Sequence, residues 1–176
     1  MKALSEFSKI LLAEALGEAA KFVRLEANAV ECAALAVRFE LVSVESLVGD
    51  LIIERIKGSE IIRVRGRMSA EIQQFCVISG ETVRGNLVES VDERFSSSDE
   101  TGIEIEIAFE EENPPEPIME GKIDLAEIIA QYLAVAIDPY PRAPGAKIPQ
   151  QYQDEEGDML ETRKNPFEVL SSLQRE

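Results

Sequence analysis

Apolar and polar residues alternate over several stretches of the chain, and each stretch predicts a β-strand. Gly58-Ser59 separates two of these stretches, a combination that predicts a hairpin. Because successive runs are joined by short turn-like segments, we expect them to pair in an antiparallel sheet. The strand-like runs lie at 22–26, 50–57, 60–76, 83–95 and 103–109.

Two other segments have the 3.6-residue spacing of amphipathic helices. The first is expected at 29–39, because Asn28 and Glu31 form a capping pair just before it. The second follows Asp124, its expected N-cap, and stops before Pro139. The residues expected to face the core are Val30, Ala33, Ala34, Val37 and Leu41 in the first helix, and Leu125, Ile128, Ile129, Tyr132, Leu133 and Ile137 in the second.

The run at 60–76 has one apolar and one polar side, as expected for a strand with one buried face. Its apolar side holds Ile62, Val64, Met68, Ala70, Ile72 and Cys76, and its polar side holds Arg63, Arg65, Arg67, Ser69, Glu71 and Gln73. Helices must cover the apolar side. We therefore predict an α+β fold, with a twisted antiparallel sheet or partly closed barrel, two packed helices, and an extended C-terminal tail that ends in a short helix.

Composition divides the chain into three parts. The segment after the second helix is rich in Pro, Gln and acidic residues, which is typical of an extended or disordered linker. Asn165-Pro166 then starts a last helical pattern. The predicted parts are an α+β core domain at 1–140 with an acidic loop at 110–117, a linker at 141–164 and a short helix at 165–176.

The residue inventory excludes several function classes. The 176 residues include no histidine, so histidine-dependent triads and zinc hydrolase sites are excluded. The two cysteines, Cys32 and Cys76, form no CxxC motif. The N-terminal apolar stretch contains acids and does not resemble a signal peptide, and no run is long enough to span a membrane. We expect a cytoplasmic protein with reduced thiols.

Net charge is −16, and it is concentrated in the second half of the chain. Residues 1–98 carry −3 and residues 99–176 carry −13, with nine acids and no base from 99 to 120. This acidic surface either attracts a small basic protein or only solubilises the chain. The last helix either docks on its own domain or serves as a ligand for a partner. The candidate partner residues are Glu110, Glu111, Glu112, Glu116, Phe167 and Leu170.

The polar side of the run at 60–76 presents three arginines, Arg63, Arg65 and Arg67, at about 7 Å intervals. This spacing suits phosphates along a nucleic-acid backbone, which makes the three arginines candidate RNA contacts. The alternative is that acids near them in the sheet neutralise them as ion pairs. Those acids are Glu54, Glu71, Glu89 and Asp92.

No arrangement of residues predicts catalysis. Paired carboxylates are plentiful, but the pattern places Glu104 and Glu106 on the solvent side of a strand. Cys76 lies at a strand end on the apolar side, where a packed structural thiol is expected. No Gly-rich phosphate loop and no calcium loop is present. We predict no cofactor, no metal and no small-molecule substrate.

Four segments in order carry a resemblance: EANAVECAALAVRFEL, VRGRMSAEIQQFCVISGE, GKIDLAEIIAQYLAVAIDPYPRAPGA and NPFEVLSSL. Together they resemble the YceD family of bacterial proteins, the large ribosomal RNA subunit accumulation proteins. The most specific matches are the turn from Cys76 to Gly80-Glu81, Ile123-Asp124-Leu125, Asp138-Pro139-Tyr140-Pro141 and Asn165-Pro166-Phe167.

The resemblance implies a non-enzymatic factor needed for normal accumulation of large-subunit ribosomal RNA. The expected partners are a basic ribosomal protein or large-subunit precursor RNA. Other branches of the family carry a second cysteine three residues after the first and a further cysteine group after the late helix, where a metal site is conceivable. This chain has Ser79 and Arg142-Ala143-Pro144-Gly145 there instead. The alternative function is an interaction module unrelated to ribosomes that uses the C-terminal helix as its ligand.

Overall fold

The computed structural model describes residues 6–96 and 115–147, which form a five-stranded sheet, a two-stranded sheet and two α-helices. The larger sheet has the order β2-β3-β4-β5-β6 and is antiparallel except for its β5–β6 pair. The elements are β1 (Ile10–Leu12), η1 (Ala13–Ala15), β2 (Lys21–Glu26), α1 (Ala29–Arg38), β3 (Ser43–Arg55), β4 (Ile61–Phe75), β5 (Thr82–Ser96), β6 (Glu116–Pro117), β7 (Lys122–Asp124) and α2 (Leu125–Ala136).

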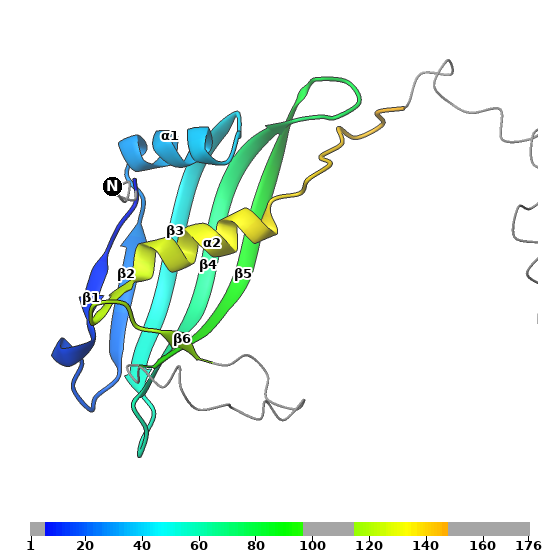
Figure 1. The fold of residues 1–176 in the computed structure, drawn as a ribbon. Coiled ribbons are helices and arrows are strands. Elements are labelled where there is room, and N and C mark those ends of the chain that lie inside the picture. The colour runs from blue at the N-terminus through cyan, green and yellow to red at the C-terminus, as the bar shows by residue number, and fades with distance from the viewer. Residues whose placement is uncertain (1–5, 97–114, 148–176) are drawn as a thin grey trace, which may run out of the picture. The chain divides into compact units, whose positions relative to one another are not determined.

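The α+β fold class predicted from the sequence is confirmed. Figure 1 shows α2 crossing one face of the sheet and α1 lying over the end of that face. The strands that the structure describes form an open sheet and no closed barrel. All the named elements lie in the first of two compact units, Met1–Ala143, and the second unit is Pro144–Glu176. No described helix has the length and apolarity that a membrane span requires.

The central hairpin is confirmed, but its first strand is longer than predicted. β3 begins at Ser43 rather than at residue 50, and it pairs with β4 along its length. A register shift between Val44 and Ser46 inserts one extra residue near the start of β3. Such a bulge breaks the two-residue period, which is why alternation alone did not reveal this part of the strand.

Helix α1 lies where it was predicted, but its predicted buried side is wrong. Asn28 and Glu31 form a complete capping box, in which each side chain accepts a backbone N–H of the other. Val30 and Val37, however, are 79% and 81% exposed. Only one residue between Ala29 and Val37 is charged, so both sides of the helix are apolar and spacing could not decide which one packs. The buried residues are Cys32, Leu35 and Ala36.

The pairing of β1 with β7 was not predicted. Ile10 to Leu12 pair antiparallel with Lys122 to Asp124, which brings the N-terminal segment to the start of α2. Strands of three residues are too short to show a clear alternation. The strand expected at 103–109 and the helix expected at 165–176 lie outside the residues that the structure describes.

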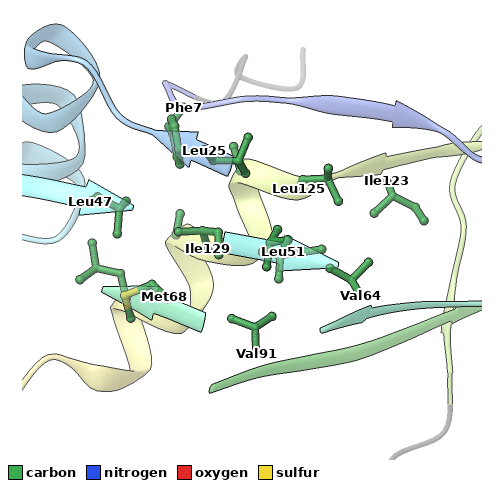
Figure 2. Close-up of a cluster of buried hydrophobic side chains, with 14 of the residues drawn as sticks. Phe7, Leu25, Leu47, Leu51, Val64, Met68, Val91, Ile123, Leu125 and Ile129 are labelled. Carbon is green, nitrogen blue, oxygen red and sulfur yellow. The ribbon is translucent and has the colours of Figure 1, made fainter. Parts of the chain in front are cut away.

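Helix α2 covers the centre of the sheet as predicted, and Asp124 caps it by accepting the N–H groups of Ala126 and Glu127. Figure 2 shows the resulting core, in which Ile129 lies over Leu51 and Met68. The helix approaches β3 closely at Gly49, where a Cβ atom would lie 2.7 Å from the Ile129 side chain. Glycine at this position therefore lets α2 pack directly against the sheet.

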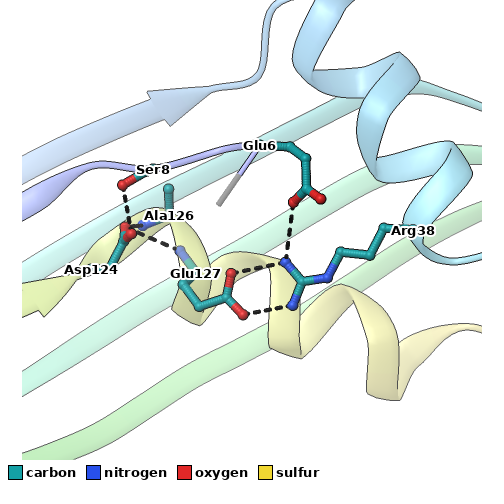
Figure 3. A network of polar contacts seen from close by, with 6 residues as sticks. All are labelled: Glu6, Ser8, Arg38, Asp124, Ala126 and Glu127. Carbon is teal, nitrogen blue, oxygen red and sulfur yellow. Dashed lines mark hydrogen bonds and ion pairs between the residues drawn. The ribbon is translucent and has the colours of Figure 1, made fainter. Parts of the chain in front are cut away.

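A polar network links the N-terminal segment to both helices (Figure 3). The Arg38 guanidinium of α1 donates two hydrogen bonds, of 2.9 and 2.6 Å, to the Glu127 carboxylate of α2. Glu6 lies 3.7 Å from the same guanidinium. On the other side, the Ser8 hydroxyl donates to Asp124. These contacts fix the two helices relative to each other at the rim of the core.

Candidate functional site

The sheet face away from the helices, called the outer face here, is open and rich in arginine. Residues opposite each other in an antiparallel pair share a face, so the strand register defines its members. Six arginines and six acids belong to it, a net charge of zero in a chain of −16. The arginines are Arg24, Arg63, Arg65, Arg67, Arg84 and Arg94, and the acids are Glu26, Asp50, Glu54, Glu71, Asp92 and, in the bulge of β3 beside Gln73, Glu45.

Two of the three candidate RNA contacts are neutralised by neighbouring strands. Arg63 donates from Nε and Nη2 to both carboxylate oxygens of Asp92, with the Nε bond at 2.7 Å. The hydrogen bonds from Arg63 hold the pKa of the Asp92 carboxyl below its usual value. Arg65 forms a 3.0 Å ion pair with Glu54. Arg63 and Arg65 therefore have less charge to offer a phosphate than the sequence pattern implied.

Arg67, the third of the row, is exposed and forms no ion pair with any residue that the structure describes. Its register partner on β3 is Asp50, but the Asp50 carboxylate accepts both its hydrogen bonds from Arg24 on β2, each at 3.0 Å. The structure thus brings the three arginines onto one face and leaves Arg67 as the uncompensated member. The alternative stated from the sequence, ion pairing with acids of the sheet, thus holds for Arg63 and Arg65, but spacing could not show that Arg67 stays unpaired within the described part of the chain.

Of the candidate partner residues, the structure describes Glu116 alone. It lies in β6, opposite Phe95 of β5, and its side chain is exposed. The other five, Glu110, Glu111, Glu112, Phe167 and Leu170, lie outside the described residues.

Phe22 on β2 is an outer-face residue that the sequence reasoning did not single out. Its side chain is 77% exposed, although it is a large apolar residue in a strand. A signal was present, since Phe22 shares the side of its alternating strand with Arg24 and Glu26 rather than with Val23 and Leu25. Phe22 therefore adds an exposed aromatic ring to the charged side chains of the outer face.

Cys76 directly follows the last residue of β4 and joins two loops there. Its buried Sγ accepts N–H groups of Ser79 at 3.3 Å and Ile78 at 3.4 Å within its own turn, and of Ala143 at 3.2 Å beyond α2. The Val77 N–H donates to the Pro141 carbonyl beside it. Hydrogen bonds from Ala143 and then Ser79 lower the pKa of the Cys76 thiol from its ordinary 9.0 to about 6.

The residues at this junction do not fit a metal. Cys76 contributes one sulfur, which already accepts three N–H groups, while Ser79 donates its hydroxyl proton to Glu81. A structural zinc site needs four thiolate or imidazole ligands, and the chain offers neither a histidine nor a third cysteine. Within residues 6–96 and 115–147 no cluster of metal-ligating side chains is found. In this chain hydrogen bonds to one sulfur join the two loops.

The fold and its surfaces define an α+β protein that displays charged and aromatic groups on an open sheet face. The family model described as "Large ribosomal RNA subunit accumulation protein YceD" matches residues 64–174, well over half of the chain. This chain belongs to the YceD family, as the sequence resemblance indicated. No curated protein and no solved structure matches it.

Proposed function

We propose that this chain is a non-enzymatic factor that supports the accumulation of large-subunit ribosomal RNA. It acts on precursor particles by contacting RNA with the outer face of its sheet and a basic ribosomal protein with its acidic segment. The observation that supports this proposal best is the clustering of six arginines on one open face of a protein with a net charge of −16. Family membership supplies the ribosomal context.

Segregation of charge is what makes RNA contact compatible with so acidic a chain. A net charge of −16 repels phosphates at long range, so binding requires a local surface where cations are not outnumbered. The outer face meets this requirement, and α1 and α2 leave it uncovered because both pack on the other side (Figure 1). Its contact with RNA is expected to weaken as salt rises.

The acidic segment supports the second contact. Residues 99–120 carry nine acids and no base, which favours encounter with a basic ribosomal protein and shields that protein from premature RNA contact. Glu116 presents its carboxylate at the surface beside the end of β5. The two contacts together would hold a basic protein near precursor RNA.

The test is a pull-down of the tagged protein from lysate at low and moderate salt, with and without nuclease, identifying both RNA and proteins. We expect large-subunit precursor RNA and at least one basic ribosomal protein in the bound fraction. Loss of the RNA and its associated proteins on nuclease treatment would place RNA at the contact. Recovery of nothing ribosomal at either salt would contradict the proposal.

Charge-reversal variants separate the two contacts. Replacing Glu110, Glu111, Glu112 and Glu116 with lysine should abolish nuclease-resistant capture of the basic protein, whereas reversing the exposed Glu14 and Glu18 should not. Unchanged capture by the fourfold variant at low salt would refute the acidic contact. Loss of capture on deletion of residues 165–176, with unchanged thermal stability, would favour the C-terminal segment as the ligand instead.

A further inference from the structure

Phe22 lies where two shallow depressions of the surface meet. One, of about 460 Å³, is lined by Phe22, Arg24, Asp50 and Arg67 together with neighbouring residues of β2, β3 and β4. The other, of about 390 Å³, extends from Phe22 past Lys21 and Lys9 toward β1. The exposed ring of Phe22 therefore stands between two hollows rather than on a flat surface.

One of the residues that line the first hollow must be glycine. A Cβ atom at Gly66 would lie 2.0 Å from the Asp50 carbonyl oxygen and 2.9 Å from Leu51 Cα. Any side chain there would force β3 and β4 apart. Gly66 thus allows the close approach of the two strands that line this depression beside Phe22.

The charge around Phe22 contrasts with that of the whole chain. Four cations and one acid line the two depressions, a local charge of +3 within a protein of −16. The acid, Asp50, is paired with Arg24. The remaining cations form no ion pair with any residue in the described parts of the chain; they are Lys9, Lys21 and Arg67.

An exposed aromatic ring flanked by unpaired cations has the chemistry of a single-strand nucleic-acid site. Bases stack on aromatic side chains whatever their sequence, and lysine and arginine bind the neighbouring phosphates. Arg67 on β4 lies two strands from Phe22 on the same face, whereas Lys9 and Lys21 line the depression at the free edge of β2. Cations across the face and at its edge suit a chain that crosses the ring with phosphates before and after the stacked base.

We propose that Phe22, with Lys9, Lys21 and Arg67 around it, binds single-stranded RNA by stacking one base and holding the adjacent phosphates. This proposal rests on the proposed function, because it names residues on the outer face, Phe22 and Arg67, and at its edge, Lys9 and Lys21, that contact precursor RNA. It does not follow from the family match, which begins at residue 64 and so includes neither Phe22 nor the two lysines. An acidic peptide would use the cations but would gain little from the ring, which is why RNA is the favoured ligand.

The test uses the full purified chain and a fluorescein-labelled single-stranded RNA decamer, with binding followed by fluorescence anisotropy at low salt. Phe22→Ala should weaken binding about tenfold or more, while Phe22→Tyr should stay within about threefold of wild type because the stacking surface is kept. Tyr140→Ala is the matched control, since Tyr140 is also an exposed aromatic residue, at 70%, but follows α2 and lines neither depression.

A second variant tests the cations independently of the ring. Lys21→Gln combined with Arg67→Gln should weaken binding and reduce the slope of log K against log salt by up to about two. No binding by the wild type, or equal binding by wild type and Phe22→Ala, overturns the inference. Equal affinity for duplex RNA overturns base stacking, and equal competition by a glutamate decamer overturns recognition of RNA.

The two proposals can fail separately. Nuclease-resistant recovery of a ribosomal protein from lysate, without RNA binding by the purified chain, would overturn the Phe22 site and leave the ribosomal role in place. Binding of RNA that depends on Phe22, with nothing ribosomal recovered from lysate, would support the site and refute the ribosomal role.

Discussion

The two faces of the central sheet are built from alternate residues of the same strands, yet they meet opposite environments. On the inner face Leu51 is 2% exposed and packs beneath α2. On the outer face Phe22 is 77% exposed, although it is also apolar and lies on the strand adjacent to Leu51. The comparison shows that hydrophobic character alone does not place a residue in the core. What places it there is the layer that covers its face.

Whether a face is covered by helices also decides whether its side chains contribute to folding or to ligand binding. A side chain on the covered face contributes to folding through burial and packing, so its removal leaves a cavity. A side chain on the open face loses little contact when truncated, and its surface is available for a ligand. The inner face should therefore respond to substitution in stability, and the outer face in binding.

The largest expected effect comes from truncating the centre of the covered face. Leu51→Ala should lower the free energy of unfolding by about 2–5 kcal/mol, because Leu51 is almost fully buried beneath α2 and a cavity would remain. Equilibrium denaturation in urea measures the change. A loss below about 1 kcal/mol would mean that α2 does not cover this face as described.

A smaller effect is expected where the helix approaches the sheet most closely. Gly49→Ala should cost about 1–3 kcal/mol, because the new Cβ would lie 2.7 Å from the Ile129 side chain. In an Ile129→Ala background the same substitution should cost less than half as much, since the conflicting atoms are gone. Equal costs in both backgrounds would show that the strain has another source.

The Cys76 junction belongs to neither face, and its contribution to stability should depend on pH. Its folded-state pKa of about 6 is below the ordinary 9.0, so its stabilising contribution is fully present above pH 9 and is lost as pH falls toward 6. The stability difference between wild type and Cys76→Ala should therefore grow from pH 6 to pH 9. Thermal unfolding of both proteins, measured across this pH range, tests whether the stability difference grows with pH.

Cys32→Ala provides the control for this pH profile. Burial, and then the nearby charge of Glu31, raise the pKa of the Cys32 thiol, a shift opposite in direction to that of Cys76. Its stability difference from wild type should not rise across this window. A parallel rise in both variants would contradict a thiolate at Cys76.

The smallest effect on stability is expected on the open face. Phe22→Ala should change the free energy of unfolding by no more than about 0.5 kcal/mol, because the ring is 77% exposed. The same denaturation experiment as for Leu51→Ala gives a direct comparison of the two faces. A loss of stability close to that of Leu51→Ala would mean that the outer face is covered in solution. The two faces would then not differ as described.

Local features of this protein were determined by its sequence. The capping box at Asn28 and Glu31, the N-cap at Asp124 and the two sides of β4 were all predicted and are all present. Each depends on residues within a few positions of one another, or on a regular two-residue period. The resemblance to the YceD family rested on short ordered segments for the same reason, and the family match confirms it.

Only the tertiary structure decided which surfaces are covered and which charges are paired. It buried Leu35 rather than Val37 on α1, neutralised Arg63 through Asp92 on another strand, and left Phe22 exposed. The bond from the Ala143 N–H to Cys76 joins residues 67 positions apart. Such contacts arise when distant segments pack together, and nothing in the local pattern of either segment specifies its partner. The candidate RNA site is of this kind, since it combines residues of β2, β4 and the N-terminal segment.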